Sequence, residues 1–407
     1  MTTGLRLKHV AKVDAGQSPS SSDVVPFDGE GMPFLQGNAE FGGQYPTAVH
    51  RCDSAPRIAD AGALLVSVRA PVGAVNIANQ RYGIGRGLAA VRPRAIHARY
   101  AYWLLLSSAG WLNSIATGST FTAISGGDLG NVSVLVTNER EQRAIADYLD
   151  RETAQIDAFI AKNEELITLL TERRASVIGS AVTRGLDERV ELSTEGPEWI
   201  GAVPAPWKVL PIKSAYSVVV GKMLNEAKSE GDPVPYVRAA NIQPDGLDLS
   251  DVKEMKATPA DRRTLALRSG DVVFVEGGGG YGRSDYLAQD LPGWIFQNHV
   301  IRLRPRPGHD GRFLNYWLQH VKRLGHYEAL SAFATIPNVS GDKLGRIEMP
   351  VPSLSQQREI VKHIEEATSR IDAAVGVAQR NVELARERRA ALISAAVTGR
   401  IDVGVAV

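Results

Sequence analysis

The sequence predicts an α+β protein with two similar mixed domains, each followed by a long helix. One long-range duplication carries this prediction: Gly126 to Asp187 recur without a gap 215 positions later as Gly341 to Asp402. Both copies have the pattern of a polar turn, a short apolar strand and a long helix. A period of this length far exceeds the roughly 20 to 50 residues of a solenoid unit, so we expect two copies of one domain-and-helix unit.

Composition limits the class of protein. A chain of 407 residues is long enough for two or three domains with their own cores. The formal net charge of +1 gives no general attraction to polyanions, so a nucleic-acid site requires local clustering of charge. A single cysteine, Cys52, excludes an internal disulfide and fits a reducing compartment. The sequence has neither a secretion signal nor an apolar run of about 18 residues, so we expect a cytoplasmic protein with no membrane partner.

The first domain is predicted over residues 1–138. Short apolar runs separated by glycine indicate strands at Phe34-Leu35, Leu64–Val68, Ala74–Ile77, Leu88–Val91 and Val132–Val136. One helix is predicted from Arg99 to Ile115, because aromatic residues and leucines recur there at helical spacing.

The second domain is predicted over residues 208–353, after a linker at 188–207 that is rich in Pro, Gly and Trp and should pack against a domain. The order of elements repeats, with strands at Tyr236-Val237, Asp271–Val275, Ile301–Arg304 and Ile347–Val351 and a helix from Gly311 to Leu324. The run Val91-Arg-Pro-Arg94 matches Leu303-Arg-Pro-Arg306. The domains have diverged more than the helices.

Long helices are predicted at residues 139–187 and 354–402, before a tail at 403–407. Apolar ladders in the first helix run through Leu149, Ile156, Asn163, Leu170 and Val177, and through Ile145, Glu152, Phe159, Leu166 and Arg173. The second helix has Ile364, Ile371, Ala378, Ala385 and Leu392. Alternating steps of three and four predict a coiled coil. Antiparallel pairing of the two helices, with pseudo-twofold symmetry, is the arrangement that we predict; parallel pairing is the alternative. Asn163 either fixes the register of this seam or lies at its solvated edge.

Positive charge gathers in one segment of each copy. Between Asp60 and Asp128 there is no acidic residue, whereas six arginines occur: Arg69, Arg81, Arg86, Arg92, Arg94 and Arg99. The second copy is similar but weaker, with Arg302, Arg304, Arg306, Arg312, Lys322 and Arg323. Such segments suit contact with DNA phosphates, although solvated surface arginines are the alternative.

Polar loop residues that could reach base edges follow the predicted strands. Arginine suits guanine, and asparagine or glutamine suits adenine. The candidate DNA-binding residues are Gln36, Asn38, Arg69, Arg86, Ser119, Thr120 and Phe121 in copy one, and Lys222, Arg238, Asn241, Tyr281, Arg283, Asn298 and Thr335 in copy two. Each could instead form a turn or satisfy a local hydrogen bond.

Catalytic patterns are weak, and we predict no catalytic, cofactor-binding or metal-binding residue. Gly277–Gly280 lacks the Gly-Lys-Ser/Thr of a phosphate loop. Asp245, Glu254 and Lys256 have the residue types of a metal-dependent nuclease, but the pattern is common by chance. Asp232-Pro-Val-Pro-Tyr236 matches a methyltransferase motif only superficially, because a valine separates its prolines.

Taken together, the repeats beginning Gln142-Arg-Ala-Ile and Gln357-Arg-Glu-Ile and the junction Glu198–Trp207 closely resemble the specificity subunit of type I restriction-modification enzymes. The resemblance spans nearly the whole chain. The N-terminus departs from it, because Leu5-Arg-Leu-Lys replaces the Trp-Ile-Gly that begins the second copy.

The resemblance implies a non-catalytic subunit whose two target recognition domains each contact one half of a bipartite asymmetric DNA site. It implies that the helices hold the domains apart and dock two methylation subunits. Those partners would bind S-adenosylmethionine, and restriction subunits, if encoded, would use ATP and Mg. The alternatives are a metal-dependent nuclease or DNA methyltransferase acting on its own, and a scaffold without DNA contact.

Overall fold

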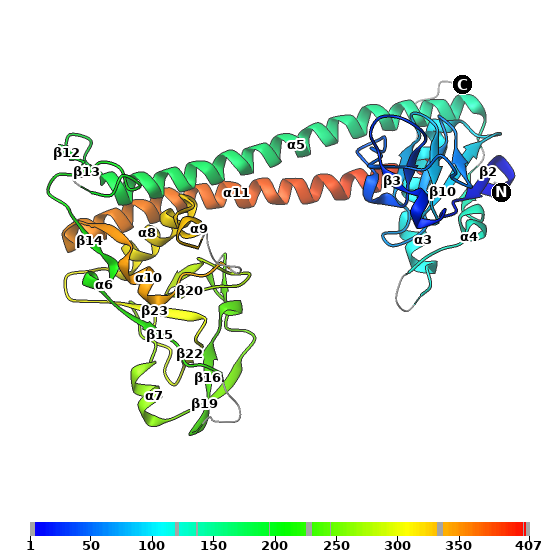
Figure 1. Cartoon of the computed structure of the whole chain (residues 1–407). Coiled ribbons are helices and arrows are strands. Elements are labelled where there is room, and N and C mark those ends of the chain that lie inside the picture. Colours follow the sequence, from blue (N-terminus) through cyan, green and yellow to red (C-terminus); the bar gives the residue numbers. More distant parts are fainter. Residues whose placement is uncertain are drawn as a thin grey trace. The chain divides into compact units, whose positions relative to one another are not determined.

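The computed structural model describes residues 5–118, 122–135, 137–194, 196–224, 230–244, 246–331, 337–401 and 403. The chain is α+β, as predicted, and divides into two compact units, Met1–Glu164 with Gln379–Val407, and Glu165–Ala378. Each unit contains one mixed domain and part of both long helices (Figure 1). Among the described residues, no helix is both long and apolar enough to cross a membrane.

The first unit contains two larger sheets, and the buried strand β7 (Leu64–Ser67) of one of them contributes side chains to two cores. The four-stranded antiparallel sheet has the order β2 (Ala11–Ala15), β10 (Leu88–Pro93), β7 and β8 (Val75–Ile77). The five-stranded sheet has the order β3 (Val25–Pro26), β5 (His50–Arg51), β4 (Pro33–Leu35), β9 (Tyr82–Ile84) and β6 (Ile58–Ala59). Side chains of β7 alternate between two cores, Leu64 and Val66 facing one and Leu65 the other. This explains why β7 is apolar at successive positions.

Short elements complete the first domain. They are β1 (Leu5–Arg6), α1 (Leu7–Val10), α2 (Ala98–Ser107), α3 (Ala109–Ile115), α4 (Gly126–Gly130) and β11 (Ser133–Val134), with 3₁₀ helices at Ser21–Asp23 and Asn38–Glu40. β1 pairs with β11. The single helix that we predicted from Arg99 to Ile115 is wrong in its extent, because a turn at Ser108 divides it into α2 and α3.

The second unit repeats this architecture. Its four-stranded sheet has the order β15 (Tyr216–Val220), β23 (Val300–Pro305), β20 (Val272–Val275) and β21 (Ser284–Tyr286). A three-stranded sheet has the order β19 (Lys253–Ala257), β16 (Asp232–Val237) and β22 (Ile295–Phe296). The smaller pairs are β12 (Leu192–Ser193) with β13 (Val203–Pro204), β14 (Lys208–Pro211) with β24 (Glu348–Val351), and β17 (Ile242–Gln243) with β18 (Gly246–Leu247).

Four helices of the second domain match those of the first, and α7 (Pro259–Thr264) is additional. The matching helices are α6 (Ile212–Ala215), α8 (Gly311–Arg323), α9 (His326–Ser331) and α10 (Gly341–Arg346), and a 3₁₀ helix lies at Ala239–Asn241. The predicted helix from Gly311 is confirmed. Linker tryptophans pack as predicted: Trp207 is buried, and Trp199 stacks on His326 with ring centroids 3.9 Å apart.

The two long helices are α5 (Glu139–Arg184) and α11 (Leu354–Val397), and they pair within each unit. In the first unit Arg389 Nε lies 2.8 Å from Asp157 and Arg386 Nη2 lies 2.8 Å from Glu164. In the second unit Arg174 Nε lies 2.8 Å from Asp372, and the Ile178 end of α5 shares a core with the Ile364 end of α11. Residue numbers rise along one helix as they fall along the other, so the pairing within each unit is antiparallel.

The ladder of Leu149, Ile156, Asn163, Leu170 and Val177 lies buried or half-buried, but the flanking ladder is wrong from Phe159 onward. Phe159 and Leu166 from that ladder are exposed. Thr153, Ile160 and Ile167, one position further along, are buried or half-buried instead. In a heptad, the next seam residue lies either three or four positions after the previous one. The sequence alone therefore did not decide which of two adjacent positions belongs to the second ladder.

Asn163 is buried, with 8% of its surface exposed, and so lies inside the seam and not at its solvated edge. Its amide donates to the Phe159 carbonyl oxygen at 2.9 Å, and its Oδ1 accepts from Asn381 Nδ2 at 3.4 Å. A polar pair inside an apolar seam favours one register, because any shift leaves an amide buried without a partner.

Candidate nucleic-acid interface

Three loops of the first domain converge at the ends of β2, β4 and β9. Gln17 N–H donates to the Ile84 carbonyl at 3.0 Å, and Gly85 N–H donates to the Leu35 carbonyl at 2.8 Å. The Ser18 hydroxyl joins the loops, accepting from Gln36 Nε2 at 3.0 Å and from the Arg86 backbone N–H at 3.4 Å. We call Gln17, Ser18, Gln36, Arg69 and Arg86 the first loop edge.

Arg69 reaches this edge from the end of β7. The preceding residue, Val68, donates its N–H to the Gly87 carbonyl at 3.0 Å, and Ile124 N–H donates to the Val68 carbonyl at 2.9 Å. Gln36, Arg69 and Arg86 are exposed, and neither arginine forms a salt bridge with any described residue. Asn38 is half-buried at the start of a 3₁₀ helix. Ser119, Thr120 and Phe121 lie outside the described residues.

Glycines permit this close packing of loops. A Cβ atom at Gly85 would lie 2.6 Å from Gln36 Oε1, and one at Gly87 would lie 2.6 Å from the Gln36 carbonyl oxygen. Such distances are too short for any side chain, so both positions require glycine while Gln36 keeps this place. The close approach of the Gly85–Gly87 backbone to Gln36 therefore determines where the Gln36 and Arg86 side chains begin.

A second loop edge in the other domain uses the same backbone framework. Lys222 N–H donates to the Phe296 carbonyl and Gln297 N–H donates to the Val237 carbonyl, both at 2.9 Å. These bonds match those of Gln17 and Gly85, so Lys222 takes the place of Gln17, Arg238 that of Gln36, and Asn298 that of Arg86. We call Lys222, Met223, Arg238 and Asn298 the second loop edge.

The electrostatics of the two edges differ. Lys222 Nζ lies 2.5 Å from Asp261, and Arg238 pairs with Asp251. The hydrogen bond from Lys222 is the largest of the effects that hold the pKa of Asp261 below its ordinary value. The second edge therefore carries cations that are already paired and oriented.

Two candidate DNA-binding residues of the second domain, Asn241 and Tyr281, have structural roles. Asn241 is only 3% exposed; its amide donates to the Asp248 carbonyl at 2.8 Å and its oxygen accepts from the Arg238 N–H at 3.0 Å. The Tyr281 hydroxyl donates to the Tyr327 carbonyl at 2.7 Å, and burial raises the pKa of Tyr281. Both side chains hold loops in place, so neither is among the DNA contacts proposed below. Arg283 lines a cavity considered later, and Thr335 lies outside the described residues.

Several arginines of the positive segments are neutralised by distant acids, which corrects the expectation of a uniform positive face. In the first unit Arg92 Nη1 lies 2.5 Å from Asp14, and Arg99 Nε lies 2.7 Å from Asp150. Arg81 lies 3.5 Å from Asp60. Arg69, Arg86 and Arg94 form no salt bridge with a described residue, and two of these three, Arg69 and Arg86, lie at the first loop edge.

The same correction applies to the second segment. Arg304 forms two hydrogen bonds of 2.7 Å with the buried carboxylate of Asp271. Arg302 is 4% exposed and donates to the Thr264 and Ala266 carbonyls. Burial lowers the pKa of Arg302 to about 10, so its side chain stays charged at neutral pH. Both arginines stabilise the core and are not available to phosphates.

The residues of the nuclease alternative do not form a site in the described part of the chain. Glu254 and Lys256 are exposed on β19, and Asp245 lies outside the described residues. Within the described ranges, no group of three or more His, Cys, Asp or Glu side chains is placed to hold a metal ion. Asp232–Tyr236 forms β16, paired along its length with β19.

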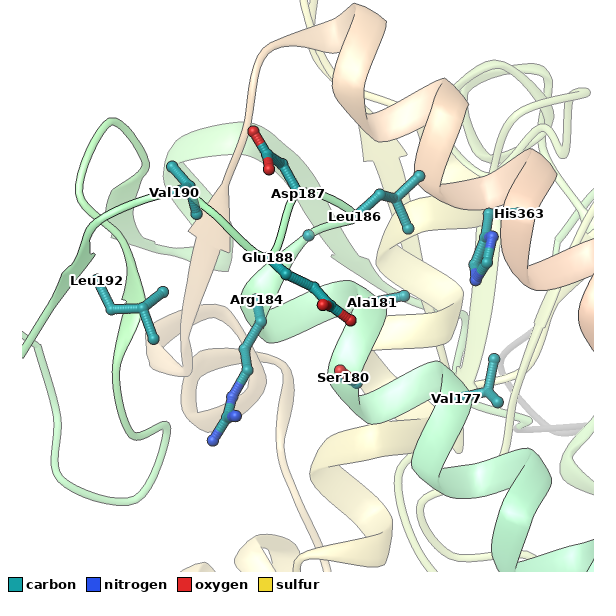
Figure 2. Close-up of a pocket in the computed structure, with 11 residues that line it drawn as sticks. Val177, Ser180, Ala181, Arg184, Leu186, Asp187, Glu188, Val190, Leu192 and His363 are labelled. Atoms are coloured by element: carbon teal, nitrogen blue, oxygen red, sulfur yellow. The ribbon is translucent and has the colours of Figure 1, made fainter.

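A cavity of about 550 Å³ lies where α5 ends in the second unit. Glu188, in the loop after α5, and His363, on α11, line different sides of it, with Leu186 between (Figure 2). The lining comes from the end of α5, the loop that follows it and α11, not from the loop edges. The cavity is therefore a feature of the helical part of the chain.

The loop edges include positions that sequence patterns missed. Gln17 and Ser18 were not among our candidates, although Gly16-Gln17 corresponds to Gly221-Lys222 in the second domain. The shared glycine was the available signal. A gap of different length in each copy hid this pairing in the sequence.

Comparison with known proteins shows the family. The model for the type I restriction modification DNA specificity domain matches residues 4–168 and 204–375. The chain therefore belongs to the type I restriction-modification DNA specificity family.

Individual relatives agree with this assignment. A putative type I restriction enzyme MjaX specificity subunit of Methanocaldococcus jannaschii is 39% identical over 140 residues, which is 34% of this chain and 33% of that protein. The EcoKI specificity subunit of Escherichia coli K12 is 23% identical over 214 residues, 49% of this chain and 44% of that protein. The chain thus matches from about a third to under half of the length of these relatives.

Solved structures share the fold. One similar chain comes from a structure that concerns complex assembly and conformational transition of the type I R-M system. It has a TM-score of 0.69 at 16% identity, and the match covers 98% of both chains. The HsdS subunit from Thermoanaerobacter tengcongensis has a TM-score of 0.52 at 14% identity, covering 98% of this chain and 97% of that one. At these identities the likeness concerns the fold alone.

Proposed function

We propose that this chain is the DNA sequence-specificity subunit of a type I restriction-modification complex. The observation that carries the proposal is the pair of loop edges, which share one backbone framework but present different side chains. Domains 1–138 and 208–353 would each contact one half of a bipartite, asymmetric DNA site. A common framework suits a common task, and different side chains suit different bases.

Particular residues would contact DNA at each edge. At the first edge, Gln36 would contact adenine, Arg86 guanine or a phosphate, and Arg69 a phosphate, with Asn38 beside them. At the second edge, Arg238 takes the place of Gln36 and Asn298 that of Arg86, and Lys222, in the place of Gln17, would also contact DNA. The carboxylate partners of Lys222 and Arg238 orient these cations before DNA arrives, which lowers the entropy cost of binding.

Chemistry would reside in the partners of this chain. Methylation subunits would bind S-adenosylmethionine and modify adenine, and restriction subunits, if encoded, would use ATP and Mg. Purified chain alone, with Mg or with S-adenosylmethionine, should neither cleave nor methylate DNA. Adding methylation subunits should give methylation at one split sequence. Activity of the chain alone, lost on Asp245→Ala, would support the nuclease alternative instead.

The helices at 139–187 and 354–402 would serve as spacer and docking surface. Leu169 and Leu384 occupy the same position of the repeat, 215 residues apart, and are 55% and 62% exposed. Leu384 lines a cavity of about 380 Å³ with Phe159 in the first unit. Equivalent exposed leucines in both units suit two copies of one partner, which motivates a stoichiometry of two methylation subunits.

Replacing Leu169 or Leu384 with glutamate should weaken partner docking without unfolding the chain. An exposed substitution changes stability by roughly 0.5 kcal/mol or less, whereas a carboxylate in an apolar interface is costly. Mass photometry of the mixture should show one bound methylation subunit for each single variant and none for the double variant. Leu324→Glu changes an exposed leucine outside the repeat and serves as control. Full occupancy of the double variant would exclude this docking surface.

Lengthening both helices by one heptad should widen the gap between the two half-sites. Seven residues at about 1.5 Å each add roughly 10.5 Å, or about three base pairs at 3.4 Å. The insertions follow Asn163 in α5 and Arg380 in α11, because Asn163 and Asn381 are in contact. Sequencing of methylated sites measures the gap. If the helices do not set the spacing, the gap will stay unchanged.

A further inference from the structure

A polar cavity of about 830 Å³ lies in the second unit beside β21 and α8. Its lining includes Arg283 from the turn before β21, Ser284 from that strand, and Asn315, Gln319 and Lys322 from α8. None of the functions proposed above uses this cavity, although Arg283 was a candidate from sequence.

The duplicated first domain shows what the fold requires here. Val275 N–H donates to the Arg283 carbonyl at 2.8 Å, and Ser67 N–H donates to the Ala74 carbonyl at 2.8 Å. Arg283 therefore corresponds to Ala74. The next pair follows from the helix starts: His97 N–H donates to Gln142 Oε1 at 2.7 Å, and Asp310 N–H donates to Oε1 of Gln357, the repeat equivalent of Gln142, at 2.8 Å. Ala109 and Lys322 follow His97 and Asp310 at the same separation along the chain. Lys322 thus corresponds to Ala109, and the fold does not require either cation.

Neighbouring residues of the lining differ in the same way. Val75, Tyr102 and Leu106 belong to or pack against the apolar core of the first domain. The strand register and the helix starts align these three with Ser284, Asn315 and Gln319 of the second domain. Polar residues have replaced an apolar surface at one side of the second domain only. Such replacement costs core packing, and a ligand would offset that loss.

The charges in the cavity are unbalanced. Three cations of the lining, Arg174, Arg283 and Lys322, stand against two carboxylates: Asp372 pairs with Arg174 at 2.8 Å, and Asp285 accepts the Tyr286 backbone N–H at 2.8 Å. Arg283 Nη1 donates to Gln243 Oε1 at 3.3 Å, and neither Arg283 nor Lys322 forms a salt bridge to a described residue. Burial and then the nearby Arg283 charge lower the pKa of Lys322, against a weaker opposing effect of Glu328. Two partly buried cations that repel each other are relieved by an anion.

We propose that Arg283 and Lys322 bind a phosphate group in this cavity. Guanidinium supplies a planar fork of N–H donors and ammonium a compact positive charge, a combination suited to phosphate oxygens. The phosphate comes either from the DNA backbone or from free phosphate. The DNA backbone would pass close to the cavity, because the end of β20 connects it to the second loop edge. Val275 N–H donates to the Arg283 carbonyl, and the next residue, Glu276, donates its N–H to the carbonyl of His299, the neighbour of Asn298. Only the DNA source rests on the proposed function.

Titration of inorganic phosphate into the full chain tests the free ligand. The decisive variant is Arg283→Ala with Lys322→Ala, which installs the alanines of the first domain. Calorimetry should show phosphate binding to the wild type, weakened at least tenfold in the double variant. The control, Lys208→Ala with Arg346→Ala, removes two exposed cations of the same domain and should bind phosphate like the wild type. Arg283→Lys with Lys322→Arg keeps both charges and should retain binding.

Salt dependence of DNA binding by the assembled complex tests the DNA source. Loss of one phosphate contact should lower the slope of log K against log salt by about 0.9, with no change in the preferred sequence. If the wild type binds inorganic phosphate but the double variant leaves the salt slope unchanged, the ligand of the cavity is free phosphate. If the double variant lowers the salt slope and the wild type does not bind inorganic phosphate, the ligand is a phosphate of the DNA backbone. If the double variant changes neither, the proposal is wrong. A complex without any sequence preference would refute the proposed function, and phosphate titration alone would then decide on the cavity.

Discussion

Replacing Arg86 and Gln36 with alanine should remove most of the sequence-specific affinity of the assembled complex. Each well-oriented contact with a base edge contributes about 1 to 3 kcal/mol, or roughly 5- to 150-fold in affinity. Both side chains are exposed, and the Ser18 hydroxyl accepts one hydrogen bond from the Gln36 side chain and one from the Arg86 backbone N–H. Fluorescence anisotropy with the cognate site and a scrambled site measures the loss.

Arg81→Ala is the matched control for this experiment. Arg81 precedes β9 and Arg86 follows it, so the two arginines lie at opposite ends of one short strand. Both are exposed, but Arg81 lies 3.5 Å from Asp60 and outside the first loop edge. We expect Arg81→Ala to change specific affinity little. An equal loss in both variants would mean that general positive charge, rather than the loop edge, holds the DNA.

Replacing Asp271 with alanine should destabilise the second domain by about 3 kcal/mol, because breaking a buried ion pair typically costs 3 to 5 kcal/mol. Asp271 is 1% exposed and pairs with Arg304, and its Oδ2 also accepts the Arg268 backbone N–H at 2.8 Å. Arg304 retains some contact with solvent, which places the loss at the lower end. Denaturant unfolding, followed by fluorescence of the tryptophans, measures the change.

Asp342→Ala provides the comparison for Asp271. Asp342 pairs with Arg346 at 3.0 Å, but both side chains are exposed, and such a pair contributes only about 0.3 to 0.5 kcal/mol. We expect the midpoint of unfolding to be nearly unchanged. A small loss for Asp271→Ala as well would show that Arg302 and Arg304 tolerate burial without their carboxylate.

The sequence predicted the repeated helices from their heptad period and most strands of the four-stranded sheets from their short apolar runs. It missed β2, β15 and β21, whose mixed side chains are largely half-buried at the edge of a sheet. The strands of β3, β5, β6 and β9 are two or three residues long, too short for any period to appear. Such strands form because tertiary contacts compensate for weak local preference.

Charge segments were a weaker guide to the site. The segment between Asp60 and Asp128 contains no acid, yet Arg92 and Arg99 meet Asp14 and Asp150 from other elements. A count along the chain cannot include carboxylates that the fold supplies from a distance. Arg86 and Arg69, in contrast, were candidates as polar loop residues after strands, and neither forms a salt bridge with a described residue. The same reasoning also selected Asn241 and Tyr281, whose side chains hold loops in place.

Mapping of methylated adenines in the native genome by single-molecule sequencing tests the central claim most directly. The account predicts one asymmetric motif made of two short half-sites separated by a fixed gap of unspecified bases. The Arg86→Ala and Gln36→Ala variant should relax one half-site and leave the other and the gap unchanged. A continuous motif, or relaxation of both half-sites together, would contradict the assignment of one half-site to each domain.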